Sequence, residues 1–355
     1  MNELSSLALL VTYQCNVECK HCGLNCSPNN KEWMSLDEMK KLALDSSKLG
    51  ASSIVLTGGE PTLIKHVDLC NYLRFVKGNT TIKNIRIVTN GHWAKSYDKA
   101  FKILSDWKVA GLDELNVSCG EFHQEYVPLK NIGFAYKAGC DINFKTVLVA
   151  GEFTTSSCKN KHSLKDFENS LNCRAIKSAD LNPFTLYKHA FTCNSAVNYG
   201  RGQHYISRED IPQIKYEDLP NLCVDTISTL SCHPDGNVTI CCGVASPGLP
   251  FLSIGNWREE DLSVIFERAN DDLISNIIRY FGLKSFMERV AKNTNLKIHP
   301  KSSYSGNCEL CIELFTNKDV LDYLQSKGLE LEDDIIARKI IINSTINSSN
   351  YVYKT

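Results

Sequence analysis

The sequence predicts an α/β fold, a partial (β/α)6 barrel followed by a smaller C-terminal domain. Short apolar runs alternate with helical patterns over about 200 residues, which is typical of βαβ units that build a parallel sheet with both faces covered. Glycine-rich or polar motifs follow these runs, as expected for chemistry at the C-terminal ends of barrel strands. After about residue 205 the alternation stops and cysteines become dense, which indicates a second unit.

The predicted strands are short apolar runs that end beside polar or glycine residues. Runs of this length are typical of buried parallel strands. The first leads directly into a cysteine-rich loop, and the second ends in two glycines. The strands are expected at residues 7–12, 53–57, 85–89, 114–118 and 142–149, with a sixth at 175–181.

The predicted helices lie between these strands. Ser35 and Glu38 form a capping-box pattern at the start of the first helix, in which each side chain bonds the backbone N–H of the other residue. The helices are expected at residues 35–49, 66–76, 96–109, 124–138 and 163–171.

The C-terminal part of the chain is predicted to be organised differently. Pro212 and Pro220 interrupt regular structure, and residues 261–293 have the pattern of two amphipathic helices. Beyond residue 318 the sequence indicates a helix with a polar end. The predicted units are residues 1–205 for the barrel, 206–318 for the second domain and 319–355 for the helix and tail.

The composition argues against a nucleic-acid or membrane partner. Lysine and arginine number 39 against 40 aspartates and glutamates, and the net charge is -1, so no excess charge steers the chain to a polyanion. No apolar run is long enough to span a membrane, and no signal peptide is recognisable. We therefore expect a cytoplasmic protein, in which 16 cysteines indicate metal ligands or reactive thiols.

Three cysteines, Cys15, Cys19 and Cys22, follow the first predicted strand with the spacing C-x3-C-x2-C. Three thiolates hold a [4Fe–4S] cluster by three irons and leave the fourth iron open, whereas clusters that only carry electrons normally take four cysteines. A structural zinc site is the alternative, and it would need a fourth ligand. The spacing resembles that of the radical S-adenosylmethionine (SAM) superfamily, which implies that the open iron binds SAM.

The same resemblance implies roles for residues at other strand ends. The run Gly58–Gly59–Glu60 resembles the superfamily motif that binds the amino group of the methionine moiety, and a plain glycine turn is the alternative. Ser118 and Glu121, after the fourth strand, are expected at the ribose. Asn90, after the third strand, is expected on the same rim, where a plain Asn-Gly turn is the alternative. Arg201 is expected to pair with the SAM carboxylate, and a solvent-exposed arginine is the alternative.

A second group of cysteines lies in the C-terminal half. Cys223 and Cys241 belong to a C-x12-G-x4-C pattern, and Cys308 and Cys311 form a C-x2-C pair. Four thiolates suffice for a complete [4Fe–4S] cluster, and a four-cysteine zinc site is the alternative. The arrangement resembles the "twitch" half of the SPASM module, which implies an Fe–S auxiliary domain with one auxiliary cluster.

Cys242 stands next to Cys241 in the sequence. Neighbouring residues rarely both reach one cluster, so one thiol is left over. A free thiol is a good hydrogen-atom donor, because its S–H bond is weaker than a typical C–H bond. A leftover thiol of this pair, or Cys232 as a further spare thiol, could therefore return a hydrogen atom to a substrate radical; a buried structural cysteine is the alternative.

A narrower resemblance, to radical SAM peptide epimerases of the epipeptide type, is carried by six runs. In chain order they are CNVECKHCGLNCSP, TGGEP, TNGHW, VSCGEFHQEYV, HPDGNVTICC and CELCIELF. The resemblance implies conversion of L- to D-residues in a ribosomally made precursor peptide, with SAM, two [4Fe–4S] clusters and a reductant such as flavodoxin or ferredoxin. It also implies that Cys242, the second cysteine of TICC, is the hydrogen donor. The alternatives are peptide crosslinking, dehydrogenation of a small molecule, or a non-catalytic electron-transfer or zinc-binding protein.

Overall fold

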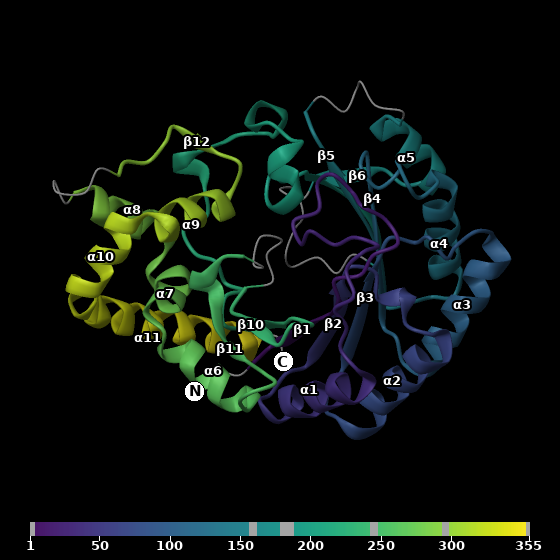
Figure 1. Cartoon of the computed structure of the whole chain (residues 1–355), viewed down its shortest axis with the longest axis horizontal. Helices are drawn as coiled ribbons and strands as arrows, with labels where there is room; N and C mark the ends of the chain where they lie inside the picture. Colours follow the sequence, from purple (N-terminus) through teal and green to yellow (C-terminus); the bar gives the residue numbers. More distant parts are fainter. Residues whose placement is uncertain (1–3, 156–161, 178–187, 242–247, 293–297, 353–355) are drawn as a thin grey trace.

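The computed structural model describes residues 4–155, 162–177, 188–241, 248–292 and 298–352. Its centre is one sheet with the strand order β11-β10-β9-β1-β2-β3-β4-β5-β7-β6. Helices α1 to α5 form an outer arc around the β1 to β6 part of this sheet (Figure 1). The predicted α/β fold with a parallel-strand core is therefore confirmed.

Seven strands build the barrel part of the sheet, and all of them pair in parallel. The polar ends of these strands consequently meet at one edge, where the predicted site residues lie. The strands are β1 (Ser6–Thr12), β2 (Ser53–Gly58), β3 (Asn84–Thr89), β4 (Glu114–Gly120), β5 (Thr146–Phe153), β6 (Ala175–Lys177) and β7 (His189–Ser195).

The last barrel strands differ from the prediction. Residues 175–177 form β6, but β6 lies at the edge of the sheet, and residues 178–181 lie outside the described chain. The position beside β5 belongs to β7 instead, which was not predicted. The reason is that β7, with the sequence HAFTCNS, buries only its central residues and has no continuous apolar run.

The helices of the barrel are α1 (Leu36–Lys48), α2 (His66–Asn79), α3 (Tyr97–Ala110), α4 (Leu129–Asp141) and α5 (Leu164–Leu171). The capping box predicted at Ser35 is present, which satisfies backbone N–H groups that have no partner inside the helix. Helix α4 begins at Leu129 rather than near residue 124, because Pro128 occupies its N-cap. Strand β5 begins at residue 146 rather than 142.

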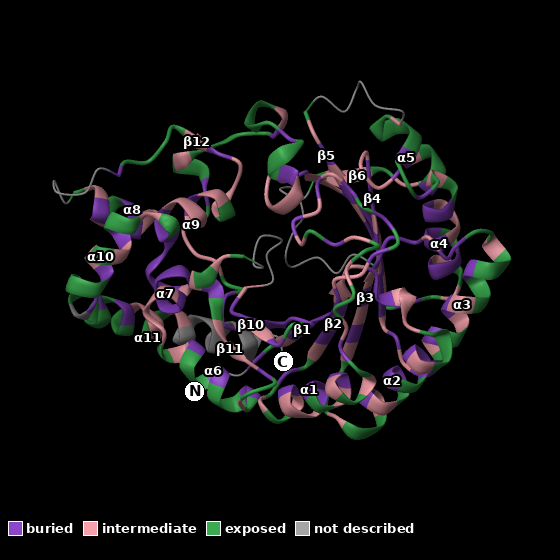
Figure 2. Ribbon diagram, in the orientation of Figure 1, coloured by how far each residue is buried: buried purple, intermediate pink, exposed green. Residues whose placement is uncertain are grey.

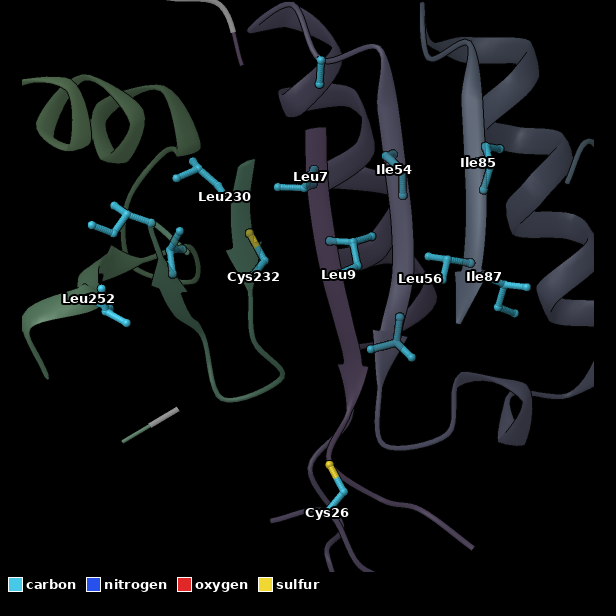
Figure 3. Packing of buried hydrophobic residues seen from close by; sticks show 14 of the residues in the cluster. Leu7, Leu9, Cys26, Ile54, Leu56, Ile85, Ile87, Leu230, Cys232 and Leu252 are labelled. Atoms are coloured by element: carbon cyan, nitrogen blue, oxygen red, sulfur yellow. The ribbon is translucent and has the colours of Figure 1, made fainter. Parts of the chain in front are cut away.

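The core lies between the sheet and these helices. Figure 2 shows buried residues on the strands and on the inner faces of α1 to α4, with exposed residues on the outer faces. In Figure 3, Leu9 of β1 and Leu56 of β2 lie on neighbouring strands beside Ile87 of β3, and all three are almost fully buried. This continuous apolar layer fixes the strand ends that carry the site.

The sheet continues beyond the barrel into the C-terminal half. Strand β9 (Thr229–Cys232) pairs in parallel with β1, and β10 (Asn237–Thr239) and β11 (Ser253–Asn256) follow in antiparallel order. Leu230 and Cys232 of β9 are buried beside β1 (Figure 3). The cysteine-rich half is therefore joined to the barrel by backbone hydrogen bonds, and the domain boundaries at residues 205 and 318 stay predictions.

Helices complete the C-terminal half (Figure 1). Two helices were expected in residues 261–293; the described part contains α6, α7, a π-helical turn and α8. None of the described helices is long and apolar enough to cross a membrane. The elements are α6 (Leu262–Asp271), α7 (Leu273–Asn276), the turn Ile277–Phe281, α8 (Leu283–Ala291), α9 (Asn307–Thr316), α10 (Lys318–Lys327) and α11 (Leu329–Val352), with a small sheet of β8 (Ile214–Lys215) and β12 (Ser303–Tyr304).

Candidate active site at the carboxyl edge of the barrel

The three cysteines of the C-x3-C-x2-C motif converge on one cavity. The loop leaves β1 and folds back, with the backbone N–H of Cys15 donating to the carbonyl of Ser27 at 3.1 Å and that of Cys22 to the carbonyl of Cys19 at 3.2 Å. All three cysteines line a cavity of about 220 Å³. The strand ends that share it contribute Gly58, Gly59, Asn90, Ser118 and Glu152.

The three thiols differ in their acidity. Burial raises the pKa of Cys15 to about 12 and also raises the pKa of Cys19. A hydrogen bond from the Cys26 thiol outweighs burial at Cys22 and lowers the pKa of Cys22 to about 6. Because thiolates are the form that binds metals, ligation at this loop releases protons from Cys15 and Cys19, whereas the hydrogen bond from Cys26 favours the thiolate at Cys22.

The donor set fits an iron–sulfur cluster. Soft thiolate sulfur is the ligand type such clusters require, and three cysteines of one loop line one cavity. Ligand atoms of Cys19, His21 and His123 also lie within 4.8 Å of one another. The Nδ1 atoms of both histidines are buried without a hydrogen-bond partner, which marks this corner as one prepared for a bound group.

The two glycines at the end of β2 allow close contact with the cysteine loop. The backbone N–H of Gly59 donates to the carbonyl of Thr12 at 2.7 Å, and that of Glu60 donates to the carbonyl of Gln14 at 3.0 Å. A Cβ on Gly59 would lie 2.1 Å from the Gln14 carbonyl oxygen, and Gly58 has a φ of +117°. The glycines are thus required by the approach of the two backbones, besides lining the cavity.

Gly59→Ala is therefore expected to destabilise the protein. Its Cβ meets backbone atoms that cannot rotate away, so we expect a loss of about 2 kcal/mol or more. Gly78→Ala in α2 is the matched control, because nothing lies within 4 Å of its Cβ and alanine favours the helix. Urea unfolding of the metal-free protein checks this; equal midpoints for the two variants would contradict the close packing.

The Glu60 carboxylate is fully buried and held by the protein. Its Oε1 accepts from the Thr62 backbone N–H and from the hydroxyls of Thr62 and Thr89, and its Oε2 accepts from the Asn90 backbone N–H at 2.7 Å. Glu60 thereby holds the end of β2 to the end of β3. The predicted contact of Glu60 with the amino group of SAM stays a prediction. Oε1 already accepts three hydrogen bonds, so only Oε2 could accept another.

Of the three residues predicted after the third and fourth strands, two face the cavity and one does not. Asn90 and Ser118 line it, and the Asn90 amide donates to Asn16 at 2.9 Å and lies 3.8 Å from the Cys15 sulfur. Glu121 instead accepts a hydrogen bond from the Thr154 backbone N–H at 2.7 Å. The carboxylate that lines the cavity is that of Glu152, so the expectation of Glu121 at the ribose is not supported by its position.

Glu152 was missed from the sequence. Its Oε2 lies 2.6 Å from His21 Nε2, and the His21 ring stacks on Phe122 at 5.0 Å. Burial works against protonation of His21, but the hydrogen bond and charge of Glu152 outweigh it and raise the pKa of His21. Glu152 could have been found from its position near a strand end. The predicted strand ends at residue 149, however, whereas β5 runs to Phe153 and includes Glu152.

Arg201 supports the cysteine loop from behind. It lies in the 3-10 helix Gly200–His204, and its guanidinium donates to the carbonyls of Cys19 at 2.8 Å and Cys26 at 2.7 Å. Its backbone N–H donates to the Cys22 carbonyl at 3.0 Å. Arg201 does not line the cavity, so the structure gives it a positioning contact, and its predicted pairing with the SAM carboxylate stays a prediction.

The four C-terminal cysteines also come together. Cys223, Cys241, Cys308 and Cys311 line a second, smaller cavity of about 50 Å³, which is otherwise mostly apolar. Burial, followed by the charges of the other three thiols, raises the pKa of Cys311. Four thiols in one pocket are the donor set of a [4Fe–4S] cluster or a zinc ion. Cys242, the predicted hydrogen donor, lies outside the described residues.

Comparison with known proteins agrees with the N-terminal motif. Residues 9–137 match the model of the radical SAM superfamily. The GTP 3′,8-cyclase of Cronobacter sakazakii is 30% identical over 187 residues, which are 48% of this chain and 52% of the cyclase. This chain therefore spans about half the length of that relative.

Two other comparisons cover more of the chain. The putative peptide biosynthesis protein YydG of Bacillus subtilis is 23% identical over 319 residues, 87% of this chain and 92% of YydG. The solved structure of native anSMEcpe with bound AdoMet and Cp18Cys peptide has a TM-score of 0.51 at 14% identity, covering 77% of this chain and 83% of that one; this likeness shows a shared fold. The similarity to the radical SAM superfamily model thus covers residues 9–137, which contain the cysteine loop and the ends of β2, β3 and β4.

Proposed function

We propose that this protein is a radical SAM enzyme that epimerises L-residues to D-residues in a ribosomally made peptide. The observation that carries the radical chemistry is the convergence of Cys15, Cys19 and Cys22 on one cavity with the ends of β2 and β3. The peptide substrate is supported by the similarity to YydG over most of both chains. Epimerisation rests on the run-by-run resemblance to epipeptide-type enzymes.

In this proposal Cys15, Cys19 and Cys22 hold a [4Fe–4S] cluster and the cavity beside them holds SAM. When bound there, cluster and SAM together supply a 5′-deoxyadenosyl radical after one-electron reduction by a partner such as flavodoxin or ferredoxin. The chain positions these groups and excludes water. Gly58 and Gly59 bring the end of β2 against the cysteine loop.

Side chains around the cavity orient the bound SAM. Asn90, held by Glu60 and Asn16, presents its amide beside Cys15. Ser118 and Glu152 line the same cavity from β4 and β5; we assign hydroxyl recognition to them, in place of Glu121, because a carboxylate and a hydroxyl accept hydrogen bonds from diol groups.

The second cysteine group holds the auxiliary [4Fe–4S] cluster of the proposal. Cys223, Cys241, Cys308 and Cys311 supply four thiolates in one small pocket, and Cys308 and Cys311 lie one turn apart on α9. Zinc would fit the same donors. Measurement of iron and acid-labile sulfide in a variant that lacks Cys15, Cys19 and Cys22 distinguishes a [4Fe–4S] cluster from zinc at this site.

In the proposed reaction Cys242 supplies the hydrogen atom that replaces the one removed from the substrate. The Cα–H bond of a substrate residue would break, and its hydrogen atom would go to the 5′-deoxyadenosyl radical to give 5′-deoxyadenosine. The Cys242 S–H bond then breaks, and a new Cα–H bond forms on the opposite face. The remaining thiyl radical takes one electron and one proton, which the auxiliary cluster and solvent would supply.

Mass spectrometry of the peptide in D2O tests this function. Epimerisation leaves the peptide mass unchanged in H2O and adds one deuterium per inverted residue in D2O, because the thiol exchanges with solvent. Peptide crosslinking or dehydrogenation removes two hydrogens and adds no deuterium. Chiral amino-acid analysis of the hydrolysed peptide identifies the inverted residue, and a product two hydrogens lighter would overturn the epimerase proposal.

A further inference from the structure

A chain of three side chains connects the two cysteine sites. Tyr13, in the loop between β1 and Cys15, has its hydroxyl 2.7 Å from His233 Nδ1. The other ring nitrogen of His233 lies 3.1 Å from the Thr239 hydroxyl, and that hydroxyl lies 3.0 Å from the carbonyl oxygen of Cys241. The chain thus runs from the loop of the first cysteine group to the backbone of the second.

The direction of these hydrogen bonds is fixed. The Cys241 carbonyl only accepts, so the Thr239 hydroxyl donates to it and its oxygen accepts from His233 Nε2–H. Burial lowers the pKa of His233 to about 4, so the ring is neutral and its Nδ1 is an acceptor. The Tyr13 hydroxyl, whose pKa is raised by burial, therefore donates to Nδ1. Each bond orients the next, and hydrogen bonds in such chains polarise one another.

Both ends of this chain are anchored. His233 and Thr239 are fully buried, and the His233 carbonyl accepts from the Trp257 indole N–H at 2.9 Å. The Tyr13 backbone N–H donates to Glu32, and the Tyr13 carbonyl accepts from Ser27 at 3.3 Å. Buried polar groups in a fully satisfied network have little freedom to move, so a displacement at one end is transmitted to the other.

We propose that Tyr13, His233 and Thr239 are positioning residues that couple the two cysteine sites. They fix the Cys241 carbonyl relative to the loop of Cys15. This inference rests on the proposed function. As a consequence, the hydrogen donor and the site of radical formation keep a fixed relative position. Loss of this hydrogen-bond relay, the chain Tyr13–His233–Thr239, lets the substrate radical form without an efficient return of hydrogen.

Tyr13→Phe tests the relay, because it removes only the hydroxyl that reaches His233. The first measurement is the amount of 5′-deoxyadenosine formed per inverted residue. We expect this ratio to rise about tenfold, since small misplacements of reacting groups have effects of this order or larger. Thr239→Val, at the other end of the relay, is expected to raise the ratio in the same way.

The second measurement does not depend on turnover. In a Cys15/Cys19/Cys22→Ala background only the auxiliary site binds a cluster. Tyr13→Phe is expected to shift the midpoint potential of that cluster, in the same direction as Thr239→Val. The double variant is expected to shift it no further than the larger single change, because both act on one chain of bonds.

Trp33→Phe is the matched control. The Trp33 indole N–H bonds Gln14 within the same loop at 2.9 Å and does not extend to the C-terminal half. Trp33→Phe should leave both the ratio of 5′-deoxyadenosine to inverted residues and the midpoint potential of the auxiliary cluster at their wild-type values. An unchanged auxiliary potential and an unchanged ratio in Tyr13→Phe would overturn the relay. A wild-type protein that binds no auxiliary cluster, or that inverts no residue, would instead overturn the proposed function.

Discussion

Replacement of Cys15, Cys19 and Cys22 together by alanine is expected to abolish formation of 5′-deoxyadenosine. The three thiols line one cavity with the ends of β2 and β3, and among the described cysteines only Cys26 lines it as well. Cys26 alone would leave one thiolate where three are needed to hold the cluster. We expect the product to fall below detection, with iron reduced to the content of the auxiliary site.

The control for this variant removes the same number of thiols elsewhere. Cys70, Cys140 and Cys173 line neither cysteine cavity. Their joint replacement by alanine should leave iron content and 5′-deoxyadenosine formation near the wild-type values. If the control loses activity as the first variant does, the effect is a general loss of folding and the assignment of the cluster loop is unsupported.

Cys242→Ala is expected to separate radical formation from inversion. The proposed SAM site is built by Cys15, Cys19 and Cys22 and the strand ends beside them, so SAM cleavage should continue in the presence of peptide. The substrate radical then has no thiol to return hydrogen to its opposite face. We expect D-residue formation to fall by at least about a hundredfold, as for loss of a group that acts only in the reaction, while 5′-deoxyadenosine is still produced.

Cys232→Ala is the matched control for this prediction. Cys232 is a fully buried thiol on β9, ten residues earlier in the chain, and it packs beside β1 (Figure 3). Its replacement should cost some stability but leave inversion intact. Normal inversion by Cys242→Ala would contradict the donor assignment, and loss of inversion in Cys232→Ala alone would transfer that role to Cys232.

Most of the barrel was predictable because its signals are local. The first five strands carry leucine, isoleucine or valine at contiguous or alternating positions, and the Ser35 capping box marks the start of α1. Strand β7 was missed because its burial comes from its place between β5 and β6, not from its own composition. Helix α4 begins later than its helical pattern predicts because Pro128 occupies its N-cap.

The candidate site was predictable where one short motif carries the chemistry. The convergence of Cys15, Cys19 and Cys22 follows from their spacing on one loop. Glu152 and the Tyr13–His233 contact depend on residues far apart in the chain, brought together by the pairing of β4 with β5 and of β1 with β9. The guanidinium of Arg201 lies against loop carbonyls, a contact that no sequence pattern specifies.

The most direct measurement of the central claim is an electron paramagnetic resonance titration with SAM. Protein purified and reconstituted without oxygen is reduced, and its spectrum is recorded before and after addition of SAM, with 5′-deoxyadenosine measured in the same sample. We predict a reduced [4Fe–4S] signal that changes on SAM addition and disappears in the Cys15/Cys19/Cys22→Ala variant, together with formation of 5′-deoxyadenosine. Zinc in place of iron at these cysteines, or a cluster signal that SAM leaves unaltered without any 5′-deoxyadenosine, would contradict the account.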